Sequence, residues 1–275
     1  MHTTKDWSQF TFFELWNPWL FGFILVVAAA YAIGTNQMRR RIEEPEPFPV
    51  KRKLSFYGGL FILYVAAGSP LQALGHHYLF SAHMMQQSLM FFFVPPLLLL
   101  GTPTWLIRPL FQNNRVRKWT RVLTNPILAV GSFNILLSFY HFPIIFDFMM
   151  SHSILGSFYH FAIFITSIQM WWLITCPLPE YERLSELKKM AYIVVNGLLL
   201  YPACAAIIFA GKPLYMTYMH APQLFAFLPP EDDQQFGGVI MKLMQEAALI
   251  FVLALNFFKW YRRERQNDNA DTQQL

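Results

Sequence analysis

Charged residues are scarce in this sequence. Only 13% of its 275 residues are charged, whereas 55% are hydrophobic and 28 are phenylalanine. A soluble domain of this length carries a larger share of charge, and a single core cannot bury so much apolar surface. The composition therefore excludes an ordinary soluble domain and indicates an integral membrane protein built as one compact bundle.

Cysteine and catalytic motifs are scarce as well. Cys176 and Cys204 form neither a CxxC motif nor a disulfide framework, so we expect two small buried side chains. The sequence contains no glycine-rich phosphate loop, no GxSxG motif and no HExxH motif. It also lacks the matching halves that are typical of many secondary transporters. We therefore expect a protein that is not an enzyme.

The sequence has long apolar runs instead. A helix needs about 20 apolar residues to cross the hydrocarbon of a bilayer. The runs predict an all-α polytopic bundle of seven transmembrane helices, forming one domain over 1–265 and followed by a disordered polar tail over 266–275. The expected spans are 16–34, 54–72, 80–100, 126–146, 154–175, 190–210 and 237–259.

The basic residues predict the orientation of this bundle. With seven spans, all but three of the 21 Lys and Arg residues fall on one side, and the exceptions are Lys5, Lys212 and Lys242. Cytoplasmic loops carry the excess of Lys and Arg in membrane proteins. We therefore expect the N-terminus outside and the C-terminus in the cytoplasm. The net charge of +5 then reflects topology and contact with a lipid bilayer, and no nucleic-acid partner is expected.

The eight histidines all fall outside or in the outer half of an expected span. Three of them, His83, His141 and His160, lie on three different spans, and Glu246 lies on a fourth. A rise of about 1.5 Å per residue places all four roughly 5–15 Å below the outer surface. Carboxylates within a span usually face a bundle interior or a water-filled cavity. The shared depth predicts a functional site that joins four helices.

Imidazole and thioether groups together favour a transition metal, and thioether selects Cu(I). We expect a copper site made by His83, His141 and His160, with Glu246, Met241 or His152 as further ligands. The run MTYMH suggests a surface element that captures metal through Met216, Met219 and His220. Ordinary explanations remain open: single histidines can be interfacial, methionines can fill the bundle, and Glu246 can pair with Lys242 one helical turn away.

Several of these segments resemble the Bacillus-type CtaG family, whose members are assembly factors for caa3-type cytochrome c oxidase. The resemblance covers roughly residues 15–260, with the motifs in the same order. An unrelated single-span copper chaperone shares the name but does not resemble this sequence. The segments that carry the resemblance are SAHMMQQSL (81–89), PPLLLLGTP (95–103), Asn125-Pro126, His141 with Pro143, His160 with Trp171-Trp172, and DQQFGG (233–238) before Met241 and Glu246.

The resemblance implies a multi-pass protein of the bacterial plasma membrane that helps to build the oxidase at a copper centre. Its partners would be oxidase subunits, and a homo-oligomer is possible. Many relatives have a second histidine where this chain has Gln87, four residues after His83 and on the same helical face. We expect Gln87 to orient the site or hold a water. Alternative functions are a haem-binding protein, a metal-free scaffold for oxidase subunits and a copper transporter.

Overall fold

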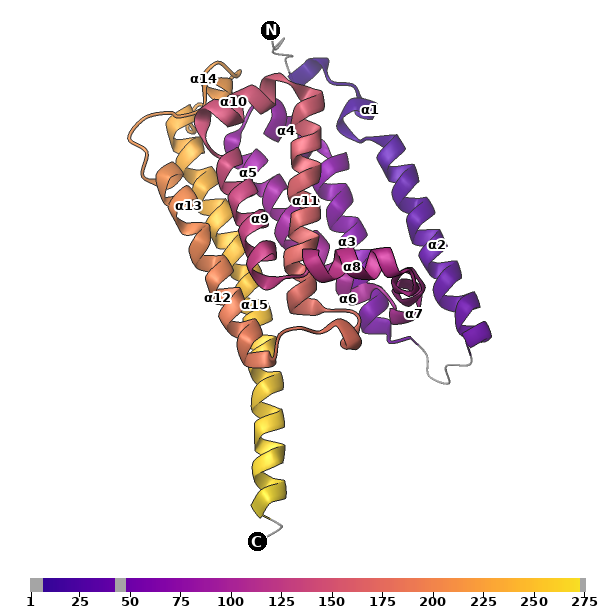
Figure 1. Ribbon diagram of the computed structural model, residues 1–275. Helices are drawn as coiled ribbons and strands as arrows, with labels where there is room; N and C mark the ends of the chain where they lie inside the picture. The colour runs from indigo at the N-terminus through magenta and orange to yellow at the C-terminus, as the bar shows by residue number, and fades with distance from the viewer. Residues whose placement is uncertain (1–6, 43–47, 273–275) are drawn as a thin grey trace.

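The computed structural model describes residues 7–42 and 48–272, and the regular structure in these ranges is entirely helical. The long helices run side by side and form a bundle (Figure 1). The main helices are α2 (Pro18–Ile42), α3 (Val50–Gly68), α4 (Pro70–His77), α5 (Phe80–Ser88), α6 (Val94–Gly101), α9 (Pro126–Tyr140), α11 (Ser153–Thr175), α12 (Glu186–Leu199), α13 (Tyr201–Ile208) and α15 (Pro230–Thr272). The short helices are α1 (Phe12–Leu15), α7 (Thr104–Ile107), α8 (Asn114–Leu123), α10 (Pro143–Ser151) and α14 (Met216–Met219).

The helices are long and apolar enough for a multi-pass membrane protein, as predicted. In the described part of the chain, five stretches could cross a membrane, and counting each of two bent helix pairs as one span gives up to seven. The five stretches are Pro18–Asn36, Phe80–Gly101, Ser153–Thr175, Glu186–Ile208 and Pro230–Gln266. The bent pairs are α3 with α4, at 44°, and α8 with α9, at 67°.

The fourth expected span is shorter than predicted. Its helix α9 ends at Tyr140, and His141 is the C-terminal cap. Phe142 takes an extended conformation because the following Pro143 disfavours helical geometry at the residue before it. Pro143 then begins the separate helix α10, which lies at the same end of the bundle as α4 and α14 (Figure 1).

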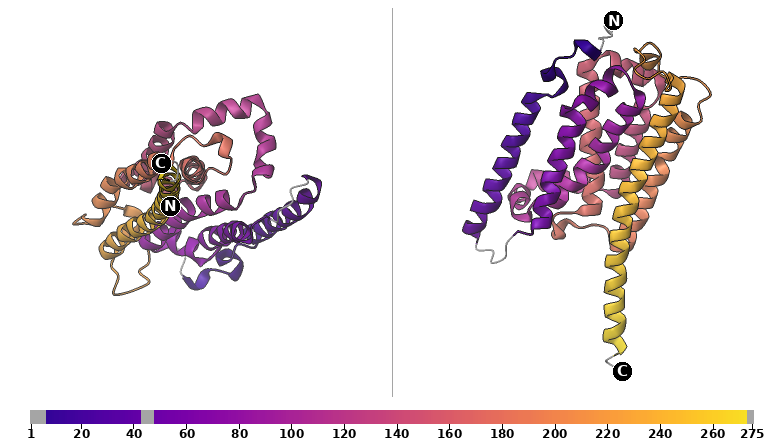
Figure 2. Two further views of the ribbon diagram at one scale, coloured as in Figure 1. Left: turned by 90° about the horizontal axis from the view of Figure 1, so that it is seen from below. Right: turned by 180° about the vertical axis from the view of Figure 1, so that it is seen from behind.

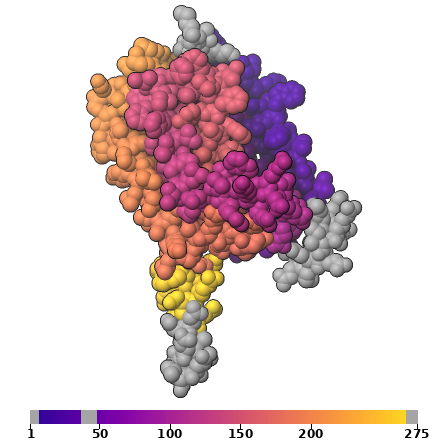
Figure 3. Space-filling model, in the orientation of Figure 1, coloured from indigo at the N-terminus to yellow at the C-terminus, as the bar shows by residue number. Residues whose placement is uncertain are grey.

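Helix α8 precedes this span as an amphipathic surface helix. Val116, Trp119 and Leu123 share one face and are exposed, while Arg117 and Arg121 lie toward the other face. In Figure 3 this region forms a ridge on the surface, low on the bundle between α11 and α2. Exposed apolar residues opposite a basic face are typical of a helix lying in the membrane interface.

The third span contains a π turn just before Pro95 and Pro96. Residues Leu89–Phe93 are π-helical, and the Val94 N–H donates to the Leu89 carbonyl. Pro95 has no N–H to donate to the carbonyl of Phe91. Ser167 Oγ and Trp171 Nε1 of α11 donate to that carbonyl instead, at 2.5 and 3.0 Å. Because a free carbonyl is costly within a bilayer, these two donors stabilise the irregular turn.

Helix α5 is held at its start by the two helices beside it. A Cβ on Gly75 of α4 would lie 2.9 Å from the His83 backbone nitrogen, and one on Gly237 of α15 would lie 2.6 Å from Phe80 Cδ1. Only glycine permits so close an approach at either position. Asp233 of α15 accepts hydrogen bonds from the N–H groups of Phe80 and Ser81, at 2.6 and 3.3 Å. This carboxylate therefore caps the first turn of α5 from another helix.

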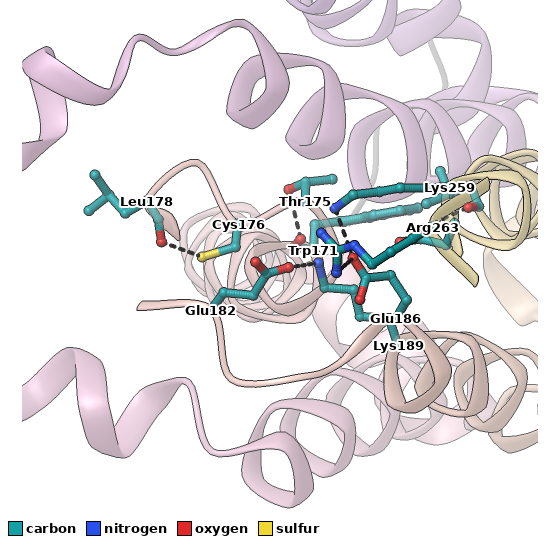
Figure 4. Close-up of polar contacts among 11 residues, drawn as sticks. Trp171, Thr175, Cys176, Leu178, Glu182, Glu186, Lys189, Lys259 and Arg263 are labelled. Atoms are coloured by element: carbon teal, nitrogen blue, oxygen red, sulfur yellow. Dashed lines mark hydrogen bonds and ion pairs between the residues drawn. The ribbon is translucent and has the colours of Figure 1, made fainter. Parts of the chain in front are cut away.

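Ion pairs tie the helices together at the opposite end of the bundle (Figure 4). Lys259 and Arg263 of α15 both pair with Glu186 of α12, at 3.1 and 3.0 Å, and the buried Lys189 pairs with Glu182. Cys176 donates to the Leu178 carbonyl at 3.1 Å, and burial raises the pKa of its thiol. Cys204 is buried, as expected, whereas Cys176 is only half-buried.

The end of the chain differs from the expected disordered tail. Helix α15 runs on as one helix through Thr272, and Figure 2 shows its last part extending beyond the rest of the bundle. Extending an existing helix adds one hydrogen bond for each residue that is fixed, so a polar segment can continue a long apolar helix. Residues 273–275 lie outside the described residues.

Candidate functional site

A cavity of about 490 Å³ lies between α4, α5, α10 and α11, toward the end of the bundle that carries α14. Its walls combine imidazole, amide and thioether groups with aromatic rings. The lining residues that bear on its chemistry are His76, His83, Gln87, Met90, Met149, Met150 and His160. Two of the predicted site residues, His83 and His160, therefore meet in one cavity, together with Gln87.

Gln87 bridges the two histidines. Its amide Nε2 donates to Nε2 of His83 and to Nε2 of His160, both at 3.0 Å. The two imidazoles therefore direct their Nε2 lone pairs at the same amide nitrogen, and each accepts one of its two protons. The imidazole rings lie 5.8 Å apart at an angle of 60°. His160 is also held by a hydrogen bond to the backbone of Gly156, which fixes the orientation of its ring.

Tyr140 of α9 packs against both histidines. Its hydroxyl lies 3.1 Å from His83 Nε2 and 3.9 Å from Met150 Sδ, and the side chain is fully buried. The ring centroid lies 4.8 Å from that of His160. The oxygen therefore sits between an imidazole and a thioether, where it can hydrogen-bond with either.

The family model for the cytochrome c oxidase caa3 assembly factor matches residues 29–263. The chain belongs to this family. No curated protein and no solved structure matches it. The family confirms the resemblance read from the motifs, and with the apolar helices it establishes a multi-pass membrane protein whose role is assembly of the oxidase.

In this caa3 assembly factor the four residues predicted at one depth do not form one ligand set. Among the described residues there is no group of three or more His, Cys, Asp or Glu side chains that could hold a metal ion. Of the expected residues His83, His141, His160 and Glu246, the structure brings His83 and His160 together in one cavity.

His141 faces away from the cavity. Its Nδ1 lies 2.6 Å from the Leu137 carbonyl, its Nε2 is buried with no hydrogen-bond partner, and it does not line the cavity. Successive residues of a helix point about 100° apart, so Tyr140 contacts His83 and His160 while the neighbouring His141 does not line the cavity. His141 also holds the neighbouring loop, because its carbonyl accepts a hydrogen bond from Tyr215 Oη at 2.9 Å.

Glu246 and Met241 lie on other faces of α15. Glu246 pairs with Lys242 at 2.6 Å and its carboxylate packs toward Gly197 of α12. Met241 is 1% exposed and belongs to the apolar core. The ordinary explanation for Glu246, an ion pair within one helix, is the one that the structure bears out.

The remaining predicted metal residues lie at the surface. His152 is exposed and its Nδ1 contacts the Phe148 carbonyl at 2.9 Å. The MTYMH segment keeps Met216, Met219 and His220 exposed. Asp147 fixes this segment, since its carboxylate accepts from the N–H groups of Met216 and Thr217 at 3.1 and 3.0 Å. None of these residues lines the cavity of His83 and His160.

Sequence reasoning missed His76, Tyr140, Met149 and Met150 as members of the site. His76 precedes His83 by seven residues, or two helical turns, and this spacing could have indicated that the two share a site. The helix is interrupted between them, however, where α4 ends and α5 begins. The sequence could not single out the other three, because tyrosine and methionine are common in it, with 12 and 13 residues. Only the packing of α9 and α10 against α11 distinguishes these three from bundle filler.

Proposed function

We propose that this caa3 assembly factor binds Cu(I) transiently between His83 and His160 and passes it to an oxidase subunit. The observation that carries the proposal is the convergence of two imidazole Nε2 atoms on one amide nitrogen, 3.0 Å from each. Both Nε2 atoms direct an electron pair toward that place, as metal binding requires, and the Gln87 amide protons hold these pairs in the absence of metal. The thioether groups of Met150 and Met90 line the same cavity and suit a soft ion.

In this scheme the Gln87 side chain blocks the metal position until a metal ion displaces it. Its two amide protons satisfy the imidazoles when no metal is bound, and they must leave before a metal can reach the same electron pairs. A two-nitrogen site with weak thioether support leaves the ion incompletely coordinated. Low coordination keeps the affinity modest and allows transfer by ligand exchange. His152, Met216, Met219 and His220 would then capture metal at the surface rather than hold it.

A metal-free scaffold is the second candidate. The hydrogen bonds that join Gln87 to His83 and His160 satisfy both Nε2 atoms without a metal, which favours this alternative. Haem is less suited to the site, because the Gln87 side chain occupies the place between the two imidazoles that a macrocycle would need. A copper transporter would move the ion across a sealed vesicle, which an assembly factor need not do.

The test is Cu(I) competition with a chromogenic chelator on purified protein kept free of oxygen. We expect one Cu(I) per chain, lost in His83→Ala and His160→Ala and retained in His152→Ala. Thermal melting of each variant checks that it remains folded. Unchanged copper content in both pocket variants would overturn the proposal. If both variants also support oxidase assembly, the scaffold is favoured, whereas a Soret band after haem supplementation would favour haem.

A further inference from the structure

An ion pair between Lys242 and Glu246 lies near the middle of the apolar stretch Pro230–Gln266, which could cross a membrane, on the face formed by α12, α13 and α15. Glu246 is midway between the acidic start of the long helix at Asp232 and its basic end at Lys259. The rise of an α-helix places it about 20 Å from each. Both polar ends are therefore too distant to bring water to its carboxylate.

Lys242 is fully occupied within the protein. Its ammonium donates to Glu246 Oε1 at 2.6 Å and to the Gly197 carbonyl at 3.2 Å, and it lies 4.7 Å from the centre of the Tyr201 ring. Gly197 is in the last turn of α12, where a cation complements the helix dipole. The three N–H groups thus have three partners, and the lysine has none left for another molecule.

Glu246 is only half satisfied by this arrangement. Its side chain remains 36% exposed, and Lys242 contacts one of its two carboxylate oxygens. The neighbouring surface is apolar, with Leu198 64%, Leu243 65% and Ile250 57% exposed. A carboxylate oxygen that faces lipid at this depth is costly, and such groups normally find a polar partner. Within the described residues, Lys242 is the one side chain that donates to this carboxylate.

We infer that this face docks a transmembrane helix of another protein, which donates a hydrogen bond to Glu246. The fit is one of charge: a helix with a donor side chain at mid-membrane depth would satisfy the free carboxylate oxygen, and its apolar residues would cover Leu198, Leu243 and Ile250. Interhelical hydrogen bonds of this kind help membrane helices to associate. The docking face is separate from the metal cavity and does not depend on copper.

A second copy of the chain does not fit the same face. Two copies related by a two-fold axis would bring the Glu246 carboxylates toward each other, and each Lys242 is already held by its own three partners. An ionised carboxylate is an acceptor only, so two Glu246 side chains that meet across such an axis cannot give each other a hydrogen bond. The occupant is therefore a different polypeptide.

The test is site-specific photocrosslinking in membranes that coexpress the chain with the caa3 oxidase subunits. A photoreactive residue replaces Leu243 or Ile250, and Ile135, which is 57% exposed on α9, serves as the matched control position. We expect adducts from 243 and 250 that map by mass spectrometry to a membrane helix of an oxidase subunit with a donor side chain at that depth. Their yield should fall at least about fivefold in Glu246→Leu, and less in Glu246→Gln, which keeps a carbonyl acceptor.

Three results would overturn the inference: adducts no stronger than those from position 135, adducts only with a second copy, or a yield that Glu246→Leu leaves unchanged. Copper affinity is measured on the same Glu246→Leu protein and should match the wild type. Loss of docking with normal copper binding, or the reverse, therefore separates this inference from the proposed function. If Glu246→Leu melts early, Glu246→Gln supplies the comparison.

Discussion

Gly75 and His83 touch backbone to backbone across two helices. A methyl group on Gly75 would lie 2.9 Å from both the nitrogen and the Cα of His83, where neither atom can yield without moving α5. We predict that Gly75→Ala destabilises the protein by about 1–3 kcal/mol, the usual range for overpacking. Thermal melting in detergent measures this. Gly22→Ala is the control, since a Cβ there has nothing within 4 Å, and an equal loss in both variants would contradict the prediction.

Gln87→His should replace the blocking amide by a third metal ligand. An imidazole at this position would face the electron pairs of His83 and His160 from the same helical face as His83. We predict Cu(I) affinity at least about tenfold tighter than in the wild type, with slower release to a competing chelator. Equal affinity in competition titrations would contradict the ligand geometry. Gln86→His, on the adjacent position of the cavity wall, is the matched control.

Asp233→Ala should remove the cap of α5. The carboxylate is 3% exposed and accepts from the first two N–H groups of α5, so its loss leaves buried donors without partners. We predict a loss of about 1–2 kcal/mol in unfolding free energy, as for other helix caps. Asp232→Ala, one residue earlier and exposed, should change little. Faster hydrogen exchange confined to residues 80–84 would locate the effect.

The π turn offers a double-mutant test. Ser167→Ala and Trp171→Phe each remove one donor to the Phe91 carbonyl, and the remaining donor can still satisfy it. We predict that the double variant costs more than the sum of the single variants, by about 1 kcal/mol or more, because only it leaves the carbonyl free. In a Pro95→Ala background, which restores an N–H to the helix, this excess should shrink. Strict additivity in the melting data would refute the account.

Glu182→Gln should leave a buried charge unpaired. Lys189 is 4% exposed and its pairing with Glu182 brings the ammonium into the bundle near its basic end. Breaking such a pair by neutralising one partner typically costs about 3–5 kcal/mol. Glu180→Gln is the control, because its partner Arg108 is 56% exposed at the side chain. Similar melting temperatures for the two variants would contradict the assignment.

Much of the fold was predictable, because apolar runs and loop charges follow from the bilayer itself. Five of the expected spans coincide with helical stretches long and apolar enough to cross a membrane, and the other two, 54–72 and 126–146, fall on the bent helix pairs. The main differences are the end of α2 at Ile42, the early end of α9 at Tyr140 and the continuation of α15 through Thr272. The pairing of His83 with Gln87 was predictable as well, since residues four apart share a helical face. Their meeting with His160 required the packing of α5 against α11.

The helix on or beside which each predicted residue lies could be predicted, whereas the direction of its side chain around the helix could not. His141 contacts the Leu137 carbonyl and Glu246 packs toward α12, so neither joins His83 and His160. Successive side chains point about 100° apart, and which of them meets the neighbouring helices depends on contacts that only the tertiary structure supplies. The same limit hid Tyr140, which stands beside His141 in the sequence and contacts His83.

Helix α15 has a mechanical consequence. Its 43 residues make a rod of about 65 Å, twice the thickness of the hydrocarbon. The rod carries the cap of α5 at Asp233, the exposed carboxylate of Glu246 and the ion pairs of Lys259 and Arg263 with Glu186. A partner that tilts or turns its protruding end would therefore move the first turn of α5, one turn from His83, as one rigid lever.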